Sequence, residues 1–406
     1  MGAGTVIVGT GQAGFEAAAS LRADGYREPI TLVGEEPHLP YQRPPLSKGF
    51  ITDKQGMDEI ELRPAMFYRD HGIELMTGEQ VVEIDRVERR VRMASDAERP
   101  YDSLVLAVGA RNRQLPVDGA ELDGVLYLRT IDEARAVKDR VRRAQNIVVI
   151  GGGFIGLELA ASARSLGKTV AVLEAQPRLM PRVVAPIISE FYRELHAKRG
   201  VDVKCGALVT EIAGGDGRAR GVVLSGGRSI ATDLVLVGIG VIPNVELALD
   251  AGLAVGNGVT VDETLRTSDG NIYAIGDCAE HPNAFAAGRV RLESVQNACD
   301  QARSVAAAIA GKCAPYAALP WFWTDQYEIR LQMAGLSIGY DAVVTRGNLQ
   351  LEKFSVFYFK EDRLIAVDSI NRPADHMIAR KLLSARTPVT RAQAGDEGVD
   401  LRKLAR

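Results

Sequence analysis

Cysteine is scarce in this chain, which has four cysteines among 406 residues. They are Cys205, Cys278, Cys299 and Cys313, and no two have the CxxC or CxxxxC spacing of a zinc site or a redox-active disulfide. A metal site and a redox disulfide are therefore not expected. We expect these cysteines to be buried, reduced thiols of a cytoplasmic protein.

Long apolar runs and a strong net charge are also missing. No apolar run approaches the roughly 20 residues that span a membrane, and the N-terminus leads directly into a strand-like run without a signal-peptide pattern. Met1-Gly2 begins like a myristoylation signal, but Val6 occupies the place of the required Ser or Thr. A net charge of −3 gives no general attraction to nucleic acid. We therefore expect a cytoplasmic protein with neither a membrane nor a nucleic-acid partner.

Glycine, in contrast, is abundant and forms a fingerprint in the middle of the chain. An apolar, β-branched run at residues 146–150 is followed by Gly151, Gly153 and Gly156, and a predicted helix and strand then lead to Glu174. This order of strand, glycine turn, helix, strand and acid is typical of a dinucleotide-binding unit. The first glycine permits a tight turn, the second lets pyrophosphate approach the helix N-terminus, and the third lets the helix pack on the strand.

A second complete fingerprint lies at the N-terminus. A predicted strand at residues 5–9 leads into Gly9, Gly11 and Gly14, and Glu35 follows the next predicted strand. A glycine-rich loop can occur by chance, but two complete units in one chain make that explanation remote.

The repetition extends beyond the fingerprints, because residues 72–84 and 200–212 share one pattern, and each leads into a predicted antiparallel meander. We therefore predict an α/β fold with two Rossmann-like dinucleotide-binding domains of the glutathione-reductase type, followed by a C-terminal α+β domain. The predicted bounds are 1–114 and 246–320 for a discontinuous first domain, 115–245 for the inserted second domain, and 321–406 for the third. The polar end, residues 387–406, is expected to pack loosely.

Two dinucleotide sites in one polypeptide suggest a tightly held, non-covalent FAD that is reduced by a diffusible nicotinamide. Asp277 ends a predicted strand that returns to the first domain, which places it at a cofactor, although a simple turn aspartate fits the pattern equally well. Glu174 favours NADH over NADPH, because a carboxylate repels a 2′-phosphate. Arg178 and Arg182 lie nearby and weaken this preference; they are expected to touch pyrophosphate or ribose, or to be solvated.

Several segments carry a resemblance to a known family. Residues 9–14, 151–158 and 275–277 resemble the glutathione-reductase-type flavoproteins, but residues 41–48 lack the CxxxxC of the members that reduce disulfides. Residues 41–48, 291–298, 321–327 and 371–373 resemble the NADH-dependent ferredoxin reductases of oxygenase systems, of the putidaredoxin-reductase type. The resemblance covers essentially the whole chain.

The fingerprints and the resemblance together imply two sets of binding residues. Those for FAD are Gly9, Gly11, Ala13, Gly14, Glu35, Arg43, Lys48, Val81, Ala107, Arg129, Asp277 and Val295. Those for NAD are Gly151, Gly153, Phe154, Ile155, Gly156, Glu158, Glu174, Arg182 and Gly240.

The resemblance also implies catalytic roles. Lys48 matches the family lysine beside flavin N5, and Glu158 is expected to pair with it across the domain junction, although a purely structural ion pair is equally compatible. Trp323 is expected near the flavin edge. Phe154 matches an aromatic residue that shields the flavin, and a core aromatic residue is the alternative.

The implied partner is a [2Fe-2S] ferredoxin, acidic in character, that supplies a cytochrome P-450. Candidate docking residues are Arg303, Arg330, Arg380 and Lys381. Val295 stands where many dioxygenase reductases carry tryptophan, which favours the P-450 branch. The alternatives are a reductase of a dioxygenase or rubredoxin system and, in another class, a flavin redox sensor resembling apoptosis-inducing factor. An NADH oxidase or peroxidase would need an active cysteine near residues 44–48, and this chain has none there.

Overall fold

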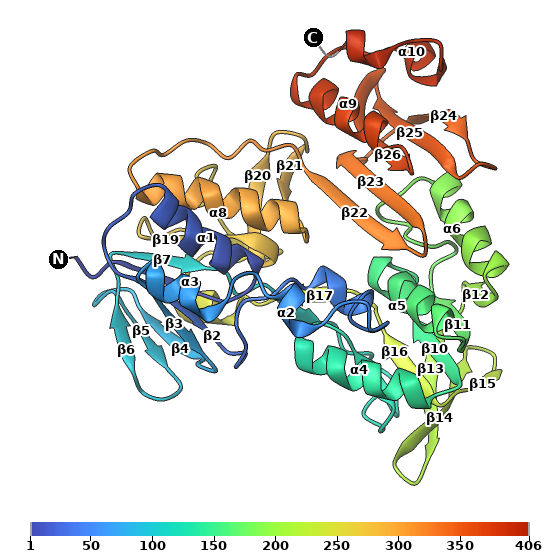
Figure 1. Cartoon of the computed structure of the whole chain (residues 1–406), viewed down its shortest axis with the longest axis horizontal. Coiled ribbons are helices and arrows are strands. Elements are labelled where there is room, and N and C mark those ends of the chain that lie inside the picture. Colours follow the sequence, from blue (N-terminus) through green and yellow to red (C-terminus); the bar gives the residue numbers. More distant parts are fainter. Residues whose placement is uncertain (1, 405–406) are drawn as a thin grey trace. The chain divides into compact units, whose positions relative to one another are not determined.

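The computed structural model describes residues 2–404, which form two compact units (Figure 1). Unit 1 comprises Met1–Gln42, Met57–Arg111 and Ile242–Phe322, and unit 2 comprises Arg43–Gly56, Asn112–Val241 and Trp323–Arg406. The short segment Arg43–Gly56 therefore belongs to unit 2, although it follows the first fingerprint in the sequence.

Unit 1 is built on a five-stranded parallel sheet of the order β19-β7-β1-β2-β3. Its strands are β1 (Thr5–Val8), β2 (Ile30–Gly34), β3 (Ile73–Thr77), β7 (Ser103–Leu106) and β19 (Ile272–Ala274). Strands β19, β7, β1 and β2 are apolar and buried along most of their length, as expected for a parallel sheet covered on both faces. Helices α1 (Gln12–Ala23) and α8 (Val295–Ile309) pack against each other beside it (Figure 1).

Smaller elements complete unit 1. The predicted meander is present as β4 (Val81–Asp85), β5 (Arg90–Met93) and β6 (Glu98–Pro100). The others are α2 (Met57–Ile60), α3 (Ala65–Asp70), α7 (Glu246–Asp250), β18 (Val259–Thr260), η2 (Gly276–Cys278), β20 (Ala279–Asn283) and β21 (Gly288–Val290). The short strands β8 (Ala110–Asn112) and β17 (Val241–Pro243) form a pair.

Unit 2 repeats this plan, which confirms the predicted duplication. Its parallel sheet has the order β12-β11-β10-β16-β9, and the strand that precedes the glycine turn again lies third in the order. The strands are β9 (Val125–Tyr127), β10 (Asn146–Ile150), β11 (Thr169–Glu174), β12 (Val201–Cys205) and β16 (Leu234–Val237). The remaining elements are η1 (Pro44–Ser47), α4 (Ile131–Arg143), α5 (Phe154–Ser165), α6 (Pro186–Lys198) and the meander β13 (Val209–Gly215), β14 (Arg218–Leu224) and β15 (Ser229–Ala231).

The C-terminal part of unit 2 is a separate α+β layer around a sheet of the order β22-β23-β26-β25-β24 (Figure 1). Its elements are β22 (Trp321–Gln326), β23 (Ile329–Gly335), β24 (Ala342–Asn348), β25 (Lys353–Lys360), β26 (Arg363–Ile370), α9 (Pro373–Ser384), α10 (Arg391–Gly395) and η3 (Leu401–Lys403). Residues 360–363 are four consecutive charged residues between two apolar runs, a pattern that predicts a hairpin, and β25 and β26 form one. Glu361 and Asp362 form its two-residue turn with φ of 49° and 59°, the positive values that a right-twisted hairpin favours.

The expectation of a loosely packed C-terminus is wrong for residues 387–404. Arg346 is 7% exposed and donates hydrogen bonds to the carbonyl oxygens of Asp396, at 2.5 Å, and Val399, at 2.9 Å. Val389 and Leu401 are buried. A buried guanidinium needs acceptors, so Arg346 holds the polar end of the chain against the sheet.

The four cysteines are free thiols, but only Cys278 is buried, and Cys313 is exposed. The expectation of burial is therefore wrong for Cys313, which lies beyond the end of α8. Among residues 2–404, no helix is both long and apolar enough to cross a membrane, and no three His, Cys, Asp or Glu side chains gather as metal ligands would.

One buried carboxyl lies in the C-terminal layer. Asp368 is 2% exposed on β26 and accepts a hydrogen bond of 2.5 Å from the hydroxyl of Tyr358, which itself accepts from the Ala185 N–H. Burial raises the pKa of Asp368 to about 7, and the hydrogen bond from Tyr358 only partly opposes this.

This raised pKa predicts a pH-dependent stability. The contribution of Asp368 to folding stability is fully present below pH ~4, where the carboxyl is protonated in the unfolded chain as well as in the folded one. This contribution is lost as the pH rises through ~7. Between those limits, the free energy of unfolding of the wild type should fall by roughly 1 kcal/mol per pH unit because of Asp368. Asp368→Asn stays neutral and should lack this fall. Thermal unfolding across this range measures it, with the exposed Asp341→Asn as control; equal slopes for wild type and Asp368→Asn would contradict it.

Candidate functional site

The fingerprint of unit 1 lies at the carboxyl ends of its parallel strands, where ligands bind in such sheets. Gly9 follows β1 with φ of +111°, and a Cβ there would lie 2.2 Å from the Ala107 carbonyl oxygen, just after β7. Only glycine fits this turn. Gly14 is equally constrained, since its Cβ would lie 1.8 Å from the Gly9 carbonyl oxygen. Gly11, the N-cap of α1, differs: nothing lies within 4 Å of its Cβ position, so the helix N-terminus is open to a phosphate.

The returning strand β19 brings the Asp277 turn to the same place. Gly276 adopts φ of +75°, and its Cβ position lies 3.1 Å from the Cβ of Ala13, in the first turn of α1. Sequence reasoning missed the support of this turn. Gln301, fully buried on α8, accepts from the Gly276 N–H at 2.7 Å and also contacts the ring of His281 at 3.1 Å. Burial lowers the pKa of His281 to about 4, so the ring is neutral.

The remaining candidates of unit 1 lie at the ends of three other elements. Glu35 is exposed directly after β2, Val81 begins β4, and Val295 begins α8. The structure thus brings Gly9, Ala13, Ala107 and Asp277 together around the N-terminus of α1.

The fingerprint of unit 2 has the same geometry. Gly151 has φ of +110°, and its Cβ would lie 2.3 Å from the Gly238 carbonyl oxygen. The Cβ of Gly156 would lie 2.1 Å from the Gly151 carbonyl oxygen, so the third glycine mainly makes room for the turn itself rather than for a strand side chain. Gly153 is the N-cap of α5, and nothing lies within 4 Å of its Cβ position. The Cβ position of Gly240 is equally open. The open helix N-terminus fits a pyrophosphate group.

Glu174 is held by this fingerprint. Its Oε2 accepts from the Gly152 N–H at 2.7 Å, and its Oε1 accepts from the Gln176 N–H at 2.8 Å. The strand registers show that the equivalent position in unit 1 is Gly34, so Glu35 lies one residue further on. The two acids are therefore not equivalent, and the Glu174 carboxylate is fixed in orientation at the end of β11.

The two arginines near Glu174 behave differently. Arg178 donates to the Val184 carbonyl at 2.8 Å and to the Ser189 hydroxyl at 2.6 Å, so it anchors a loop. The alternative that Arg178 is simply solvated is wrong, because its guanidinium is bonded within the protein, while its contact with the dinucleotide stays a prediction. Arg182 is exposed on the loop that Arg178 holds.

Two side chains begin helix α5 directly after Gly153. Phe154 is partly exposed and Ile155 is 44% exposed, so Phe154 is not a fully buried core residue. Both lie at the open helix N-terminus.

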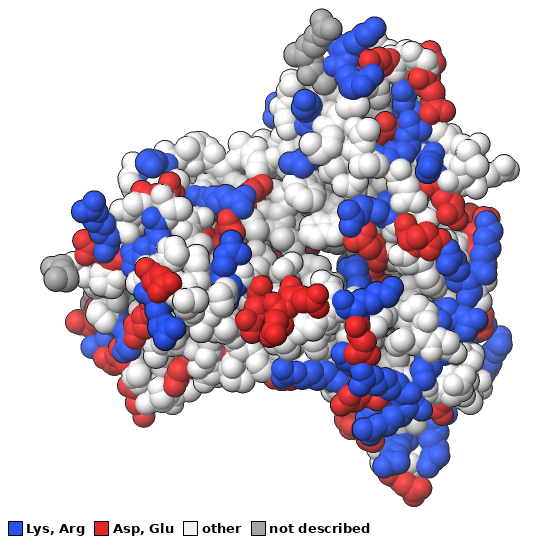
Figure 2. All heavy atoms as spheres, in the orientation of Figure 1, with Lys and Arg blue, Asp and Glu red and all other residues white. Residues whose placement is uncertain are grey.

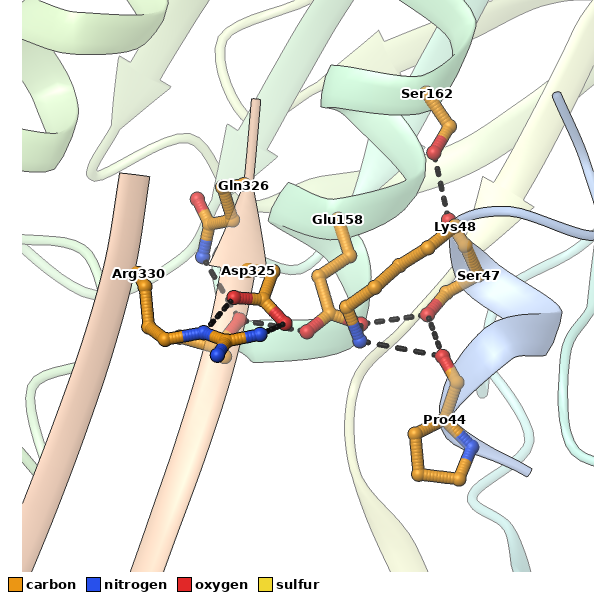
Figure 3. Close-up of polar contacts among 9 residues, drawn as sticks. Pro44, Ser47, Lys48, Glu158, Ser162, Asp325, Gln326 and Arg330 are labelled. Atoms are coloured by element: carbon orange, nitrogen blue, oxygen red, sulfur yellow. Dashed lines mark hydrogen bonds and ion pairs between the residues drawn. The ribbon is translucent and has the colours of Figure 1, made fainter. Parts of the chain in front are cut away.

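The carboxylate of Glu158 lies at the centre of a third group of candidate residues, which includes Lys48 (Figure 3). Glu158 on α5 is 3% exposed, and its Oε2 lies 2.8 Å from Lys48 Nζ, which confirms the predicted pair. The same oxygen accepts from Ser47 Oγ at 2.5 Å, and Oε1 accepts from Thr324 Oγ1 at 2.6 Å. Lys48 also donates to the Pro44 carbonyl at 3.2 Å. Both Lys48 and Glu158 belong to unit 2, so the expectation that the pair crosses a junction between units is wrong. Asp53 of the segment Arg43–Gly56 also pairs with α4 of this unit.

Sequence reasoning missed Ser47 and Thr324. The signal for Thr324 was the alternation of β22, where Thr324 and Gln326 are buried polar residues two positions apart, on one face of the strand. Trp323 directly precedes Thr324 in sequence and is partly exposed. Arg43 donates to the carbonyl oxygen of Arg129, so these two FAD candidates are neighbours.

Two of the four docking candidates, Arg303 and Arg330, are paired with carboxylates. Arg303 pairs with Glu16 at 2.7 Å, and Arg330 pairs with Asp325 at 2.7 Å. Arg380 is partly exposed and Lys381 is exposed, both on α9. Unit 2 nevertheless carries more than two thirds of the Lys and Arg residues and half of the Asp and Glu residues, so it is basic while unit 1 is acidic. Figure 2 shows basic side chains gathered over α4 and β14 and interleaved with acidic ones.

Comparison with known proteins shows which families and structures this chain resembles. Residues 4–302 match the family Pyridine nucleotide-disulphide oxidoreductase, and residues 321–405 match Reductase C-terminal. Rhodocoxin reductase of Rhodococcus erythropolis is 51% identical over 98% of this chain and 93% of its own length. Putidaredoxin reductase CamA of Pseudomonas putida is 43% identical over 98% and 96%. The crystal structure of the ferredoxin reductase for the CYP199A2 system from Rhodopseudomonas palustris superimposes with a TM-score of 0.97 at 47% identity, covering 99% of this chain and 100% of that one.

The open face at Gly153 predicts a separable effect of mutation. Gly153→Asp places a carboxylate where a phosphate would approach, so the Kd for NADH should rise about 100-fold while the melting temperature stays unchanged. Titration with NADH and thermal unfolding measure the two effects. The exposed Gly270→Asp is the control, since its Cβ position is also open. Unchanged NADH affinity in Gly153→Asp would remove the phosphate site from this turn.

Proposed function

Because this chain belongs to the pyridine nucleotide-disulphide oxidoreductase family, we propose that it is an NADH-dependent reductase of a [2Fe-2S] ferredoxin. Like its family, it is an oxidoreductase that binds FAD and uses a nicotinamide dinucleotide. The observation that carries the proposal is the pair of fingerprints, each on its own parallel sheet, in a chain without a cysteine pair beside the first. With no disulfide to accept electrons, the reduced cofactor must pass them to an external acceptor.

We assign FAD to the first dinucleotide-binding domain, residues 1–114 and 246–320, and NADH to the inserted domain, residues 115–245. Residues 321–406 form the third domain of the proposal. The support is the Asp277 turn, which joins the first fingerprint through Gly276 and Ala13, and the fixed carboxylate of Glu174 in the second.

When bound, the two cofactors supply the hydride and electron chemistry, so the protein needs no acid or base for it. The helix N-termini at Gly11 and Gly153 bind the two pyrophosphates. Glu174 accepts hydrogen bonds from the ribose hydroxyls of NADH. Lys48, held by Glu158, supplies a positive charge at the flavin, which favours its electron-rich state. Trp323 is proposed to lie near the flavin edge.

We propose a cytochrome P-450 as the terminal acceptor of the system, in the cytoplasm. The R. palustris reductase is described as serving the CYP199A2 system, and Val295 takes the place of the tryptophan expected in the dioxygenase branch. The basic character of unit 2 suits an acidic ferredoxin, with Arg330, Arg380 and Lys381 as candidate contacts there and Arg303 in unit 1.

Coenzyme preference tests the role of Glu174. Wild type should prefer NADH to NADPH by roughly 10-fold or more in kcat/KM, because a carboxylate near a phosphate costs about 1 kcal/mol or more. Glu174→Gln should narrow this preference, since the amide oxygen can still accept from the Gly152 N–H while the charge is lost. The exposed Glu190→Gln is the matched control. Equal use of both coenzymes by wild type would show that Glu174 does not select NADH.

Ferredoxin reduction tests the electron-transfer step and the docking charges together. NADH-driven reduction of a panel of [2Fe-2S] ferredoxins should be faster than transfer to oxygen. With the best acceptor, the rate should fall several-fold between about 0.05 and about 0.5 M salt, because salt screens exposed charges. Reduction of ferricyanide is the control for effects on the NADH step. A salt-independent rate would exclude electrostatic docking, and no ferredoxin reduction above the oxygen rate would overturn the proposed function.

A further inference from the structure

The carboxylate of Glu158 receives more than its ion pair with Lys48. Ser47 Oγ donates to the same oxygen at 2.5 Å, and Thr324 Oγ1 donates to the other oxygen at 2.6 Å. Both hydroxyl-bearing side chains are at most 1% exposed. They come from segments that lie 111 and 166 residues from Glu158 along the chain.

The direction of the Thr324 hydroxyl is also set. The Gln326 amide donates to Thr324 Oγ1 at 3.5 Å, and Gln326 Oε1 in turn lies 2.9 Å from Nε2 of the buried His196. Burial lowers the pKa of His196, so the ring is neutral and donates through Nε2–H to the amide oxygen. With its oxygen accepting from Gln326, Thr324 has its one proton left for Glu158.

We propose that Thr324 and Ser47 are positioning residues, which hold the Glu158 carboxylate in one orientation and thereby fix the ammonium group of Lys48. This inference rests on the proposed function, in which Lys48 acts at the flavin. A lysine has a long flexible stem and three rotatable donors, so the Lys48 ammonium keeps one position only while both of its acceptors, the Pro44 carbonyl and the Glu158 carboxylate, stay in place. A carboxylate bonded at both oxygens presents a single acceptor direction to Lys48.

The position of Thr324 gives this arrangement a second consequence. It lies on β22, next to Trp323, in the segment that begins the C-terminal match. Strand β22, the first strand of the C-terminal layer, is therefore part of the site around Glu158. Ser47 acts from the opposite side, at the end of η1, where the Ser162 hydroxyl fixes its carbonyl at 2.7 Å (Figure 3).

The test removes one hydroxyl without changing side-chain shape. In Thr324→Val, the rate of FAD reduction at saturating NADH should fall about 10-fold, because small displacements of a catalytic group cost this much or more. The Kd for NADH should stay unchanged. The midpoint potential of the bound flavin, titrated with dithionite, should become more negative, since the Lys48 charge is held less well. Thr324→Ser, which keeps the hydroxyl, should restore rate and potential.

Two further variants complete the experiment. Thr232→Val is the matched control, because this buried threonine hydroxyl of unit 2 bonds backbone groups of Asn146 and Leu234; it should leave rate and potential at wild-type values. Ser47→Ala should show the same changes as Thr324→Val, and it decides the matter if Thr324→Val does not fold. Wild-type rate and potential in the folded variants would overturn the positioning role. Failure of NADH to reduce wild type would overturn the proposed function instead, and the dithionite titration would still decide the inference.

Discussion

The burial of one carboxylate, Glu158, is the constraint on which the candidate site of unit 2 depends. A charge taken out of water is costly unless it is paired and hydrogen-bonded. Glu158 meets this requirement with Lys48, Ser47 and Thr324, which come from two other segments of the chain. The segment that carries Lys48 and the first strand of the C-terminal layer must therefore both meet helix α5. The same requirement that stabilises the charge fixes the lysine.

Another buried carboxyl, that of Asp368, shows what happens without a cation. Asp368 receives a hydrogen bond from Tyr358, and burial raises its pKa to about 7. Glu158 has a neighbouring ammonium group as well as two hydroxyls. The two carboxyls lie in the same unit and are similarly hidden from solvent, so their partners, rather than their burial, distinguish them.

The two nucleotide units show how one turn geometry can serve two cofactors. In both, the first glycine needs positive φ and the third makes room for the carbonyl oxygen of the first. They differ at the end of the second strand, where unit 1 has Gly34 and unit 2 has Glu174 bonded to the fingerprint backbone. A common scaffold thus leaves an open helix N-terminus in both units, at Gly11 and Gly153, while the strand end differs. This difference, together with the acidic unit 1 and the basic unit 2, fits the separate roles proposed for the two units.

The sequence by itself determined the parallel sheets, the glycine turns, both meanders and the β25–β26 hairpin, because each rests on spacing within a short stretch of chain. It also indicated the pair of Lys48 and Glu158, through the resemblance to a known family. Only the tertiary structure decided that Thr324 and Ser47 bond Glu158, that Arg178 anchors a loop, and that Arg346 holds the C-terminus. The physical reason is the same in each case: a buried polar group takes its partners from segments far away in sequence, and no local periodicity records which ones.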